Sequence, residues 1–264
     1  MSEEIVRYES GDGVATVTLN RPDRLNALSS ELLEALLGAV ERAVSDDRVR
    51  VLLLTGAGRG FCVGGDLQSF SAGSQGDVPV AARVSGLRRF MRISQLLRES
   101  GVVSVAAVNG ACAGAGLSLA LACDLRVASD AAVLRTAFLT AGLSGDFGGT
   151  WTLTRLLGEA RAKELYLLNE KVPAAEALRL GLVSRVFPAE EFAAQARSIA
   201  EGLAAQAPLA LRRMKQNLTD AGRVSFAEAC DHEAERHVAC SLTADAVEAA
   251  KAFLERRPAA FTGT

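Results

Sequence analysis

The sequence predicts an α/β fold followed by a helical C-terminal region. In its first half, short apolar stretches with strand character alternate with longer stretches of helical periodicity. The stretches at residues 49–55 and 102–108 are apolar almost throughout, which is typical of strands buried on both faces of a sheet. Beyond about residue 150 the strand patterns fade and helical patterns continue. Alternation of this kind indicates an α/β core.

The expected elements follow in chain order. Residues 13–19 place alternate apolar side chains on one face of a strand. Residues 29–45 carry leucine and valine at helical spacing, and Ser29 or Ser30 is the expected cap of that helix. The other expected elements are a short strand at 125–128 and helices at 80–99, 151–168, 174–180, 189–206, 208–219, 224–239 and 243–256.

A break between two regions is expected close to Pro208. The Ala-Gln-Ala sequence before this proline interrupts the helical pattern, and proline is tolerated at the start of a helix. We therefore divide the chain into a catalytic core at residues 1–206 and a helical region at residues 207–264.

Composition excludes several classes of protein. Of the 264 residues, 49% are hydrophobic and 23% are charged, so the chain can bury a large core and disorder throughout is excluded. The formal net charge of −2 leaves no basic surplus for binding a nucleic-acid backbone, so no nucleic-acid partner is expected. The most apolar stretches are too short or interrupted to span a bilayer, so no membrane association is expected.

The cysteines favour a reducing compartment. Their number, five, is odd, and no two have C-x-x-C spacing, so neither a disulfide framework nor structural zinc is expected. The acidic N-terminal segment has no apolar core of a signal peptide. Together these features predict a cytoplasmic protein.

Several familiar motifs are absent or incomplete. His232 and His237 are five residues apart, so on a helix they point about 140° apart and cannot share one metal. We therefore expect no metal site. The turns that begin at Gly56 and Gly114 lack the third glycine of a dinucleotide fingerprint, and no phosphate-binding P-loop occurs.

Two glycine turns follow the two buried strands. The first contains Gly64 and Gly65, and the second contains Gly114, Ala115 and Gly116. Glycine lets the backbone approach a ligand closely, and ligands of α/β folds bind beyond the carboxyl ends of strands. Two peptide N–H groups aimed at one point form an oxyanion hole. Either turn alone would be read as a tight connection, but the pair favours a functional site.

A third glycine-rich segment, residues 138–151, contains one acid. Asp146 lies in a glycine-flanked turn just before a predicted helix. A helix N-cap is the common role of aspartate at such a position. Combined with the two glycine turns, a catalytic role is the better interpretation.

At this point the sequence resembles the enoyl-CoA hydratase/isomerase (crotonase) family over nearly its whole length. Six motifs in the same order carry the resemblance: Asn20 to Leu28, Phe61 to Leu67, Val108 to Asp124, Gly142 to Thr150, Ala175 to Val183, and Phe253 to Phe261. The resemblance implies a spiral of β-β-α turns with a C-terminal helical trimerisation region, a homotrimer or hexamer, and an acyl-CoA thioester substrate. Coenzyme A is then part of the substrate, and no separate cofactor is expected.

The resemblance also implies residue roles. The oxyanion donors would be the amides of Gly65 and Ala115, and Asp146 would handle the proton. The residues implied along the coenzyme A channel and the acyl pocket are Arg24, Leu25, Ala27, Val63, Asp66, Leu67, Ser118, Phe138, Leu143 and Phe253.

Two departures from the family pattern bear on the reaction. Hydratases of this family use two glutamates, and the matching positions here are Ser118 and Phe138. Asp146 instead matches the aspartate of ring-1,2-epoxyphenylacetyl-CoA isomerase-like enzymes, although Gly145 replaces the usual preceding proline. The first hypothesis is therefore an enoyl-CoA isomerase that works through Asp146. The alternatives are a 2-enoyl-CoA hydratase, a dehalogenase-like hydrolase, and an acyl-CoA binder without activity.

Overall fold

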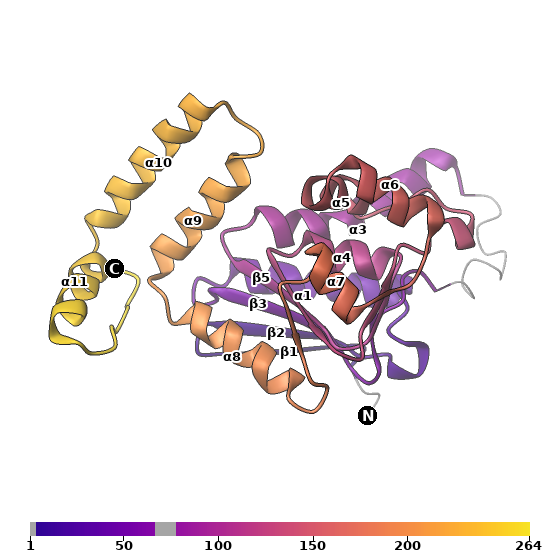
Figure 1. Ribbon diagram of the computed structural model, residues 1–264, viewed down its shortest axis with the longest axis horizontal. Helices are drawn as coiled ribbons and strands as arrows, with labels where there is room; N and C mark the ends of the chain where they lie inside the picture. Colours follow the sequence, from indigo (N-terminus) through magenta and orange to yellow (C-terminus); the bar gives the residue numbers. More distant parts are fainter. Residues whose placement is uncertain (1–3, 67–77) are drawn as a thin grey trace.

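The computed structural model describes residues 4–66 and 78–264 and shows two sheets covered by helices (Figure 1). The large sheet has the order β1-β2-β3-β5-β7-β10, with β1 antiparallel to β2 and the other neighbours parallel. The small sheet has the order β4-β6-β8-β9, in which only β8 and β9 are antiparallel. The strands are β1 (Val6–Gly11), β2 (Val14–Leu19), β3 (Val51–Gly56), β4 (Gly60–Cys62), β5 (Val103–Val108), β6 (Ala111–Ala113), β7 (Leu125–Ser129), β8 (Val133–Arg135), β9 (Val172–Pro173) and β10 (Arg185–Phe187).

Pairs of strands alternate with helices along the chain in a repeating unit. Each of β3-β4, β5-β6 and β7-β8 gives one strand to each sheet and leads toward a helix, so the chain winds as a spiral of β-β-α turns. The helices are η1 (Pro22–Arg24), α1 (Ser30–Ser45), α3 (Val80–Glu99), α4 (Ala115–Ala122), η2 (Leu139–Ala141), α5 (Gly149–Leu157), α6 (Glu159–Leu168), α7 (Ala174–Leu180), α8 (Phe192–Ala204), α9 (Pro208–Asp220), α10 (Phe226–Ser241) and α11 (Ala244–Glu255).

Helices cover both faces of the large sheet. Val51, Leu53 and Val105 point to the face covered by α8, whereas the alternate residues Leu52 and Leu54 point to the face covered by α1, α3 and α4. The predicted burial of the central strands on both faces is therefore confirmed, because a strand between two helical layers needs apolar side chains at every position.

Several boundaries differ from the sequence prediction. The helix expected at 151–168 is two helices, because Gly158 has a φ of 77° and breaks the helical path. Ser29 is the cap of α1, and its hydroxyl accepts the Leu32 N–H at 3.2 Å. The strands of the small sheet were not predicted, since segments of two or three residues are too short to show a period.

The C-terminal helices extend away from the two sheets. Helix α9 begins at Pro208, shortly after the end of α8, and α10 and α11 lie beyond it. Helix α11 is therefore far from α4 and α5 in space (Figure 1). The end of the chain folds back onto α11, where the Asp245 carboxylate accepts the N–H groups of Thr262 and Gly263. Within the residues described, none of the helices combines the length and apolarity that crossing a bilayer requires.

Candidate active site

The two glycine turns meet beside the small sheet. Because β4 and β6 pair in parallel, the segments after these strands end side by side. A Cβ atom on Gly64 would lie 3.1 Å from the Ala113 carbonyl oxygen and 3.2 Å from the Ala115 nitrogen. Gly64 and Gly114 have φ values of 90° and 53°, which strain any residue with a side chain. Glycine is therefore what lets the turns approach each other.

Two peptide N–H groups at this contact are available to a ligand. Within residues 4–66 and 78–264, no backbone carbonyl accepts the N–H of Gly65 or of Ala115. Ala115 is the first residue of α4, so its amide also lies at the positive end of the helix dipole. A Cβ on Gly116 would lie 2.2 Å from the Cys62 carbonyl oxygen, so this end of α4 packs directly onto β4. This geometry is suited to a negatively charged oxygen.

The predicted coenzyme A segment is hydrogen-bonded along the first turn. The Leu28 N–H donates to the Gly64 carbonyl at 2.8 Å, and the Asp66 N–H donates to the Leu28 carbonyl at 3.1 Å. The Val63 N–H donates to the Leu25 carbonyl at 3.2 Å. These bonds use the neighbours of Gly65 and leave its own N–H unused.

A buried asparagine fixes the shape of this segment. Asn26 has a left-handed backbone, with φ of 57°, and its side-chain amide donates to the carbonyl oxygens of Ala57 and Gly60. Arg24 is exposed beside it, and Ala27 is buried. The exposed Arg24 side chain is therefore accessible to a phosphate, whereas the Ala27 N–H already donates to the Arg24 carbonyl at 3.0 Å.

Asp66 has a protein partner that the sequence did not indicate. Both terminal nitrogens of the Arg21 guanidinium donate to Asp66 Oδ2 at 3.1 Å, and one also donates to the Ala27 carbonyl at 2.6 Å. Arg21 thus joins the coenzyme A segment to the end of the first glycine turn. Leu67, predicted beside Asp66, lies outside the described residues.

The third segment places Asp146 in an unusual backbone turn. Gly145, Phe147 and Gly148 all have positive φ, with values of 119°, 47° and 75°. A proline at position 145 could not adopt that φ, since its ring holds φ near −65°. The turn therefore follows a path that the usual proline of the family pattern would prevent.

The helix-cap interpretation of Asp146 is wrong. The N-cap of α5 is Gly148, and no side chain caps this helix. Asp146 Oδ1 is buried without a hydrogen-bond partner among the described residues. Burial raises the pKa of this carboxyl from 3.8 to about 6. A carboxyl with a pKa near neutrality can both accept and return a proton.

Asp146 lies close to two other titratable groups. Burial, and to a smaller extent the negative charge of Asp146, raises the pKa of Cys62 and of Tyr166 to about 12 each. Cys62 ends β4, just before the first glycine turn. The carboxyl is thus near the turn that carries Gly65.

Ser118 and Phe138 lie together with Tyr166. A Cβ on Gly149 would lie 2.2 Å from Ser118 Oγ and 2.7 Å from the Tyr166 hydroxyl, so the two hydroxyl groups lie on the same side of Gly149. The rings of Phe138 and Tyr166 stack in parallel, with centroids 6.1 Å apart. The two positions where hydratases carry glutamates therefore meet one tyrosine here.

The remaining predicted residues lie farther out. Leu143 is half exposed beside the Asp146 turn. Phe253 is 84% exposed on α11, and within one chain the structure does not bring it to the site, because α9 and α10 separate α11 from the sheets (Figure 1).

A cavity adjoins the Asp146 turn. It measures about 570 Å³ and is lined by Phe147, Gly148 and Trp151 on one side and by Met91 and Ser94 of α3 on the other. Helix α3 therefore forms one wall of this cavity.

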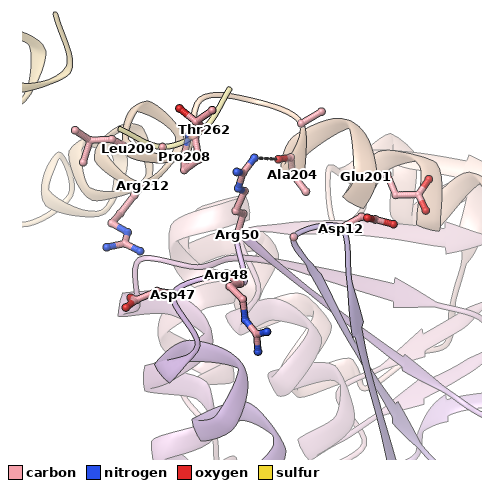
Figure 2. Close-up of a pocket in the computed structure, with 13 residues that line it drawn as sticks. Asp12, Asp47, Arg48, Arg50, Glu201, Ala204, Pro208, Leu209, Arg212 and Thr262 are labelled. Carbon is pink, nitrogen blue, oxygen red and sulfur yellow. Dashed lines mark hydrogen bonds between the residues drawn. The ribbon is translucent and has the colours of Figure 1, made fainter. Parts of the chain in front are cut away.

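A larger cavity lies at the end of the large sheet where strands β2 and β3 begin. It measures about 820 Å³ and is lined by Asp12, Arg48 and Arg50, which precede β2 and β3, and by residues of α8 and α9 (Figure 2). Its arginines point in different directions, and Arg50 donates to the Ala204 carbonyl at 2.8 Å. None of the predicted site residues lines it.

Comparison with known proteins identifies the family. The profile described as enoyl-CoA hydratase/isomerase matches residues 9–264. The chain belongs to the enoyl-CoA hydratase/isomerase family. It is accordingly an enzyme of isomerase or hydratase type that acts on coenzyme A thioesters, and both the predicted family and the predicted fold are confirmed.

Relatives within this family carry different activities in their names. The chain is 38% identical over 251 residues to 1,2-epoxyphenylacetyl-CoA isomerase of Escherichia coli (strain K12), covering 95% of each chain. It is 35% identical over 239 residues to 4-chlorobenzoyl coenzyme A dehalogenase-2 of an Arthrobacter species, covering 90% of this chain and 86% of the relative. The crystal structure of enoyl-CoA hydratase from Bacillus anthracis superposes with a TM-score of 0.91 at 30% identity, covering 99% and 100% of the two chains.

Sequence reasoning missed two residues at the site. Arg21 stood within the quoted Asn20 to Leu28 motif, so the motif itself could have singled it out. Tyr166 had no comparable signal, because a tyrosine within a helical pattern is ordinary and only the fold brings it to Ser118.

Proposed function

We propose that this enzyme is an enoyl-CoA isomerase in which Asp146 moves a proton between two carbons of the acyl group. The observation that carries the proposal is the Asp146 carboxyl, which has a buried oxygen without a partner among the described residues and a pKa raised to about 6. A single carboxyl of this kind serves as base and then as acid near neutral pH.

The oxyanion hole supplies the other half of the mechanism. The thioester carbonyl accepts hydrogen bonds from the amides of Gly65 and Ala115, which makes a neighbouring C–H acidic. Asp146 then removes that proton, and the negative charge of the enolate collects on the same oxygen. Each amide donor contributes on the order of 3 kcal/mol, as oxyanion donors do elsewhere. Asp146 returns the proton to a different carbon, so the double bond shifts.

The rest of the substrate lies along the first turn. Arg24, Leu25 and Ala27 would contact coenzyme A, with Val63, Asp66 and Leu67 along the channel. Ser118, Phe138 and Leu143 would border the acyl group, and Phe253 would reach a coenzyme A only from a neighbouring subunit. The proposed proton transfer needs no separate cofactor, and cysteine usage still favours a cytoplasmic protein.

The second candidate is a 2-enoyl-CoA hydratase, which the structural neighbour from Bacillus anthracis supports by its name. Hydration requires groups that position a water molecule and manage its protons. Ser118 and Phe138 supply no carboxylate at those two positions, which favours the isomerase.

The other two alternatives have less support. A dehalogenase-like hydrolase with Asp146 as nucleophile needs a base for water. The two histidines of the sequence, His232 and His237, are both on α10, away from the α5 end that carries Asp146 (Figure 1). A protein that only binds acyl-CoA, without catalytic activity, would not require a desolvated carboxyl at position 146.

The proposal is tested by Asp146→Asn, which keeps the shape of the site and removes the base. We expect turnover of a 3-enoyl-CoA to fall by about 10²–10⁴-fold, the usual contribution of general acid–base catalysis. Binding of acetoacetyl-CoA, followed by calorimetry, should survive the substitution.

Ser118→Ala is the matched variant at the same site. Because the Ser118 hydroxyl neither gains nor loses a proton near neutral pH, its loss should cost far less turnover. An Asp146→Asn enzyme with turnover close to wild type ends the isomerase mechanism. A larger loss in Ser118→Ala than in Asp146→Asn supports a hydratase that holds water through Ser118.

A further inference from the structure

Tyr166 occupies the space between the predicted catalytic segment and α4. Its hydroxyl lies 2.7 Å from where a Cβ of Gly149 would be, and its ring lies 3.8 Å from where a Cβ of Gly145 would be. Tyr166 thus contacts the backbone on both sides of Asp146, although it comes from α6.

The Ser118 hydroxyl is enclosed by protein atoms. Ser118 is 1% exposed, and its Oγ donates only a long bond of 3.4 Å to the Gly114 carbonyl. Gly149 closes over this hydroxyl so tightly that a Cβ there would lie 2.2 Å from Oγ. Tyr166 lies beside it, because its hydroxyl meets the same face of Gly149.

Aromatic rings fill the adjacent volume. Phe138 is buried and stacks on Tyr166 at an interplanar angle of 8°. The two positions that carry water-handling glutamates in related hydratases are therefore covered by one continuous aromatic wall. Because Ser118 is enclosed on these sides, solvent water does not reach its hydroxyl in this arrangement.

We propose that Tyr166 is a specificity-determining residue that excludes water from Ser118, so that the enolate is reprotonated instead of a double bond being hydrated. This inference rests on the proposed function. Isomerisation takes a proton from one carbon and returns one to another, and consumes no water. Hydration adds the hydrogen and the hydroxyl of one water across the double bond. Access of water to the site therefore decides between the two products.

Two variants test the inference by the ratio of products. Tyr166→Ala removes the ring, so water can reach Ser118, and we expect the ratio of hydration to isomerisation of an enoyl-CoA to rise at least about tenfold. Tyr166→Phe keeps the ring and loses the hydroxyl, so its ratio should stay close to wild type. The products are separated by chromatography. Melting curves confirm that each variant folds. If Tyr166→Ala does not fold, Tyr166→Leu is used in its place.

The outcomes separate this inference from the proposed function. A wild-type enzyme that isomerises, with an unchanged product ratio in Tyr166→Ala, overturns the role of Tyr166 alone. A wild-type enzyme that mainly hydrates overturns both. An equal rise in Tyr166→Phe also overturns the inference, because the ring is retained. Crystal structures give a readout without turnover: an ordered water on Ser118 Oγ is expected in Tyr166→Ala, and the same water in the wild type contradicts the inference.

Discussion

At the scale of single residues, the ionised Asp146 carboxylate destabilises the folded protein. Burial raises its pKa from 3.8 to about 6, so ionising this carboxyl is less favourable in the folded state than in the unfolded state. Below about pH 4 the acid is protonated in both states and the folded protein keeps its full stability. As the pH rises from 3.8 to about 6, the carboxyl ionises in the unfolded state while it stays largely protonated in the folded state, so stability is lost. Above that range the loss is complete, because both states are ionised and the folded state carries a desolvated charge.

Asp146→Asn should therefore stabilise the protein at high pH. We expect the free energy of unfolding at pH 8 to rise by on the order of 1–3 kcal/mol, and the gain to disappear toward pH 4. Urea denaturation at both pH values measures it, with Asp47→Asn at an exposed position as the matched control. A loss of stability at pH 8 would show that Asp146 stabilises its turn instead.

At the scale of elements, one lysine connects α9 to the core. Lys215 is 6% exposed, and its Nζ donates to the carbonyls of Leu97 and Val102 at 2.8 and 2.6 Å and pairs with the Asp124 carboxylate at 2.7 Å. Asp124 also accepts the Ser104 N–H at 2.7 Å. Burial lowers the pKa of Lys215, while Asp124 opposes that shift. The first C-terminal helix is thus fixed to the end of α3, the start of β5 and the end of α4.

Lys215→Met should loosen this connection. The substitution keeps an unbranched chain but leaves two buried carbonyls and the carboxylate without their shared donor, a loss of about 3–5 kcal/mol for a broken buried pair. Lys163→Met is the control, because Lys163 is exposed and pairs with Glu159 on the surface of α6. That control should cost no more than about 0.5 kcal/mol. Equal effects in urea denaturation contradict the anchoring role.

At the scale of the whole molecule, the C-terminal helices expose a large apolar area. Phe226, Leu242 and Phe253 are each more than four-fifths exposed. Other exposed apolar residues of α9 to α11 are Met214, Leu218, Val238, Val247 and Leu254. An exposed apolar surface of this extent marks an interface. We propose that residues 207–264 are an oligomerisation region and that the enzyme is a homotrimer or hexamer.

Light scattering at micromolar concentration measures the assembly. We expect three or six times the mass of the chain. Replacing Phe226 and Leu242 by serine should shift the distribution toward monomer, because the apolar area that drives association is reduced. A clean monomer for the unmodified protein contradicts the proposed assembly.

The sequence by itself determined the α/β class and the main strands and helices, and it singled out the residues of the candidate site. Glycine pairs after two buried strands and an acid between glycines are local patterns, so they were visible in the chain. The two turns meet because β4 and β6 are neighbours in one sheet, a pairing that the sequence did not predict.

Only the tertiary structure decided which residues surround that centre. Arg21 meets Asp66 and Tyr166 meets Ser118 across 45 and 48 positions of sequence, and Lys215 meets Asp124 across 91. Neither periodicity nor local turn chemistry reports such contacts, because both extend over a few residues only. The pKa of Asp146 is set by burial, which depends on what the whole chain packs around it. The sequence therefore determined the candidate catalytic groups, and the fold decided the environment in which they ionise.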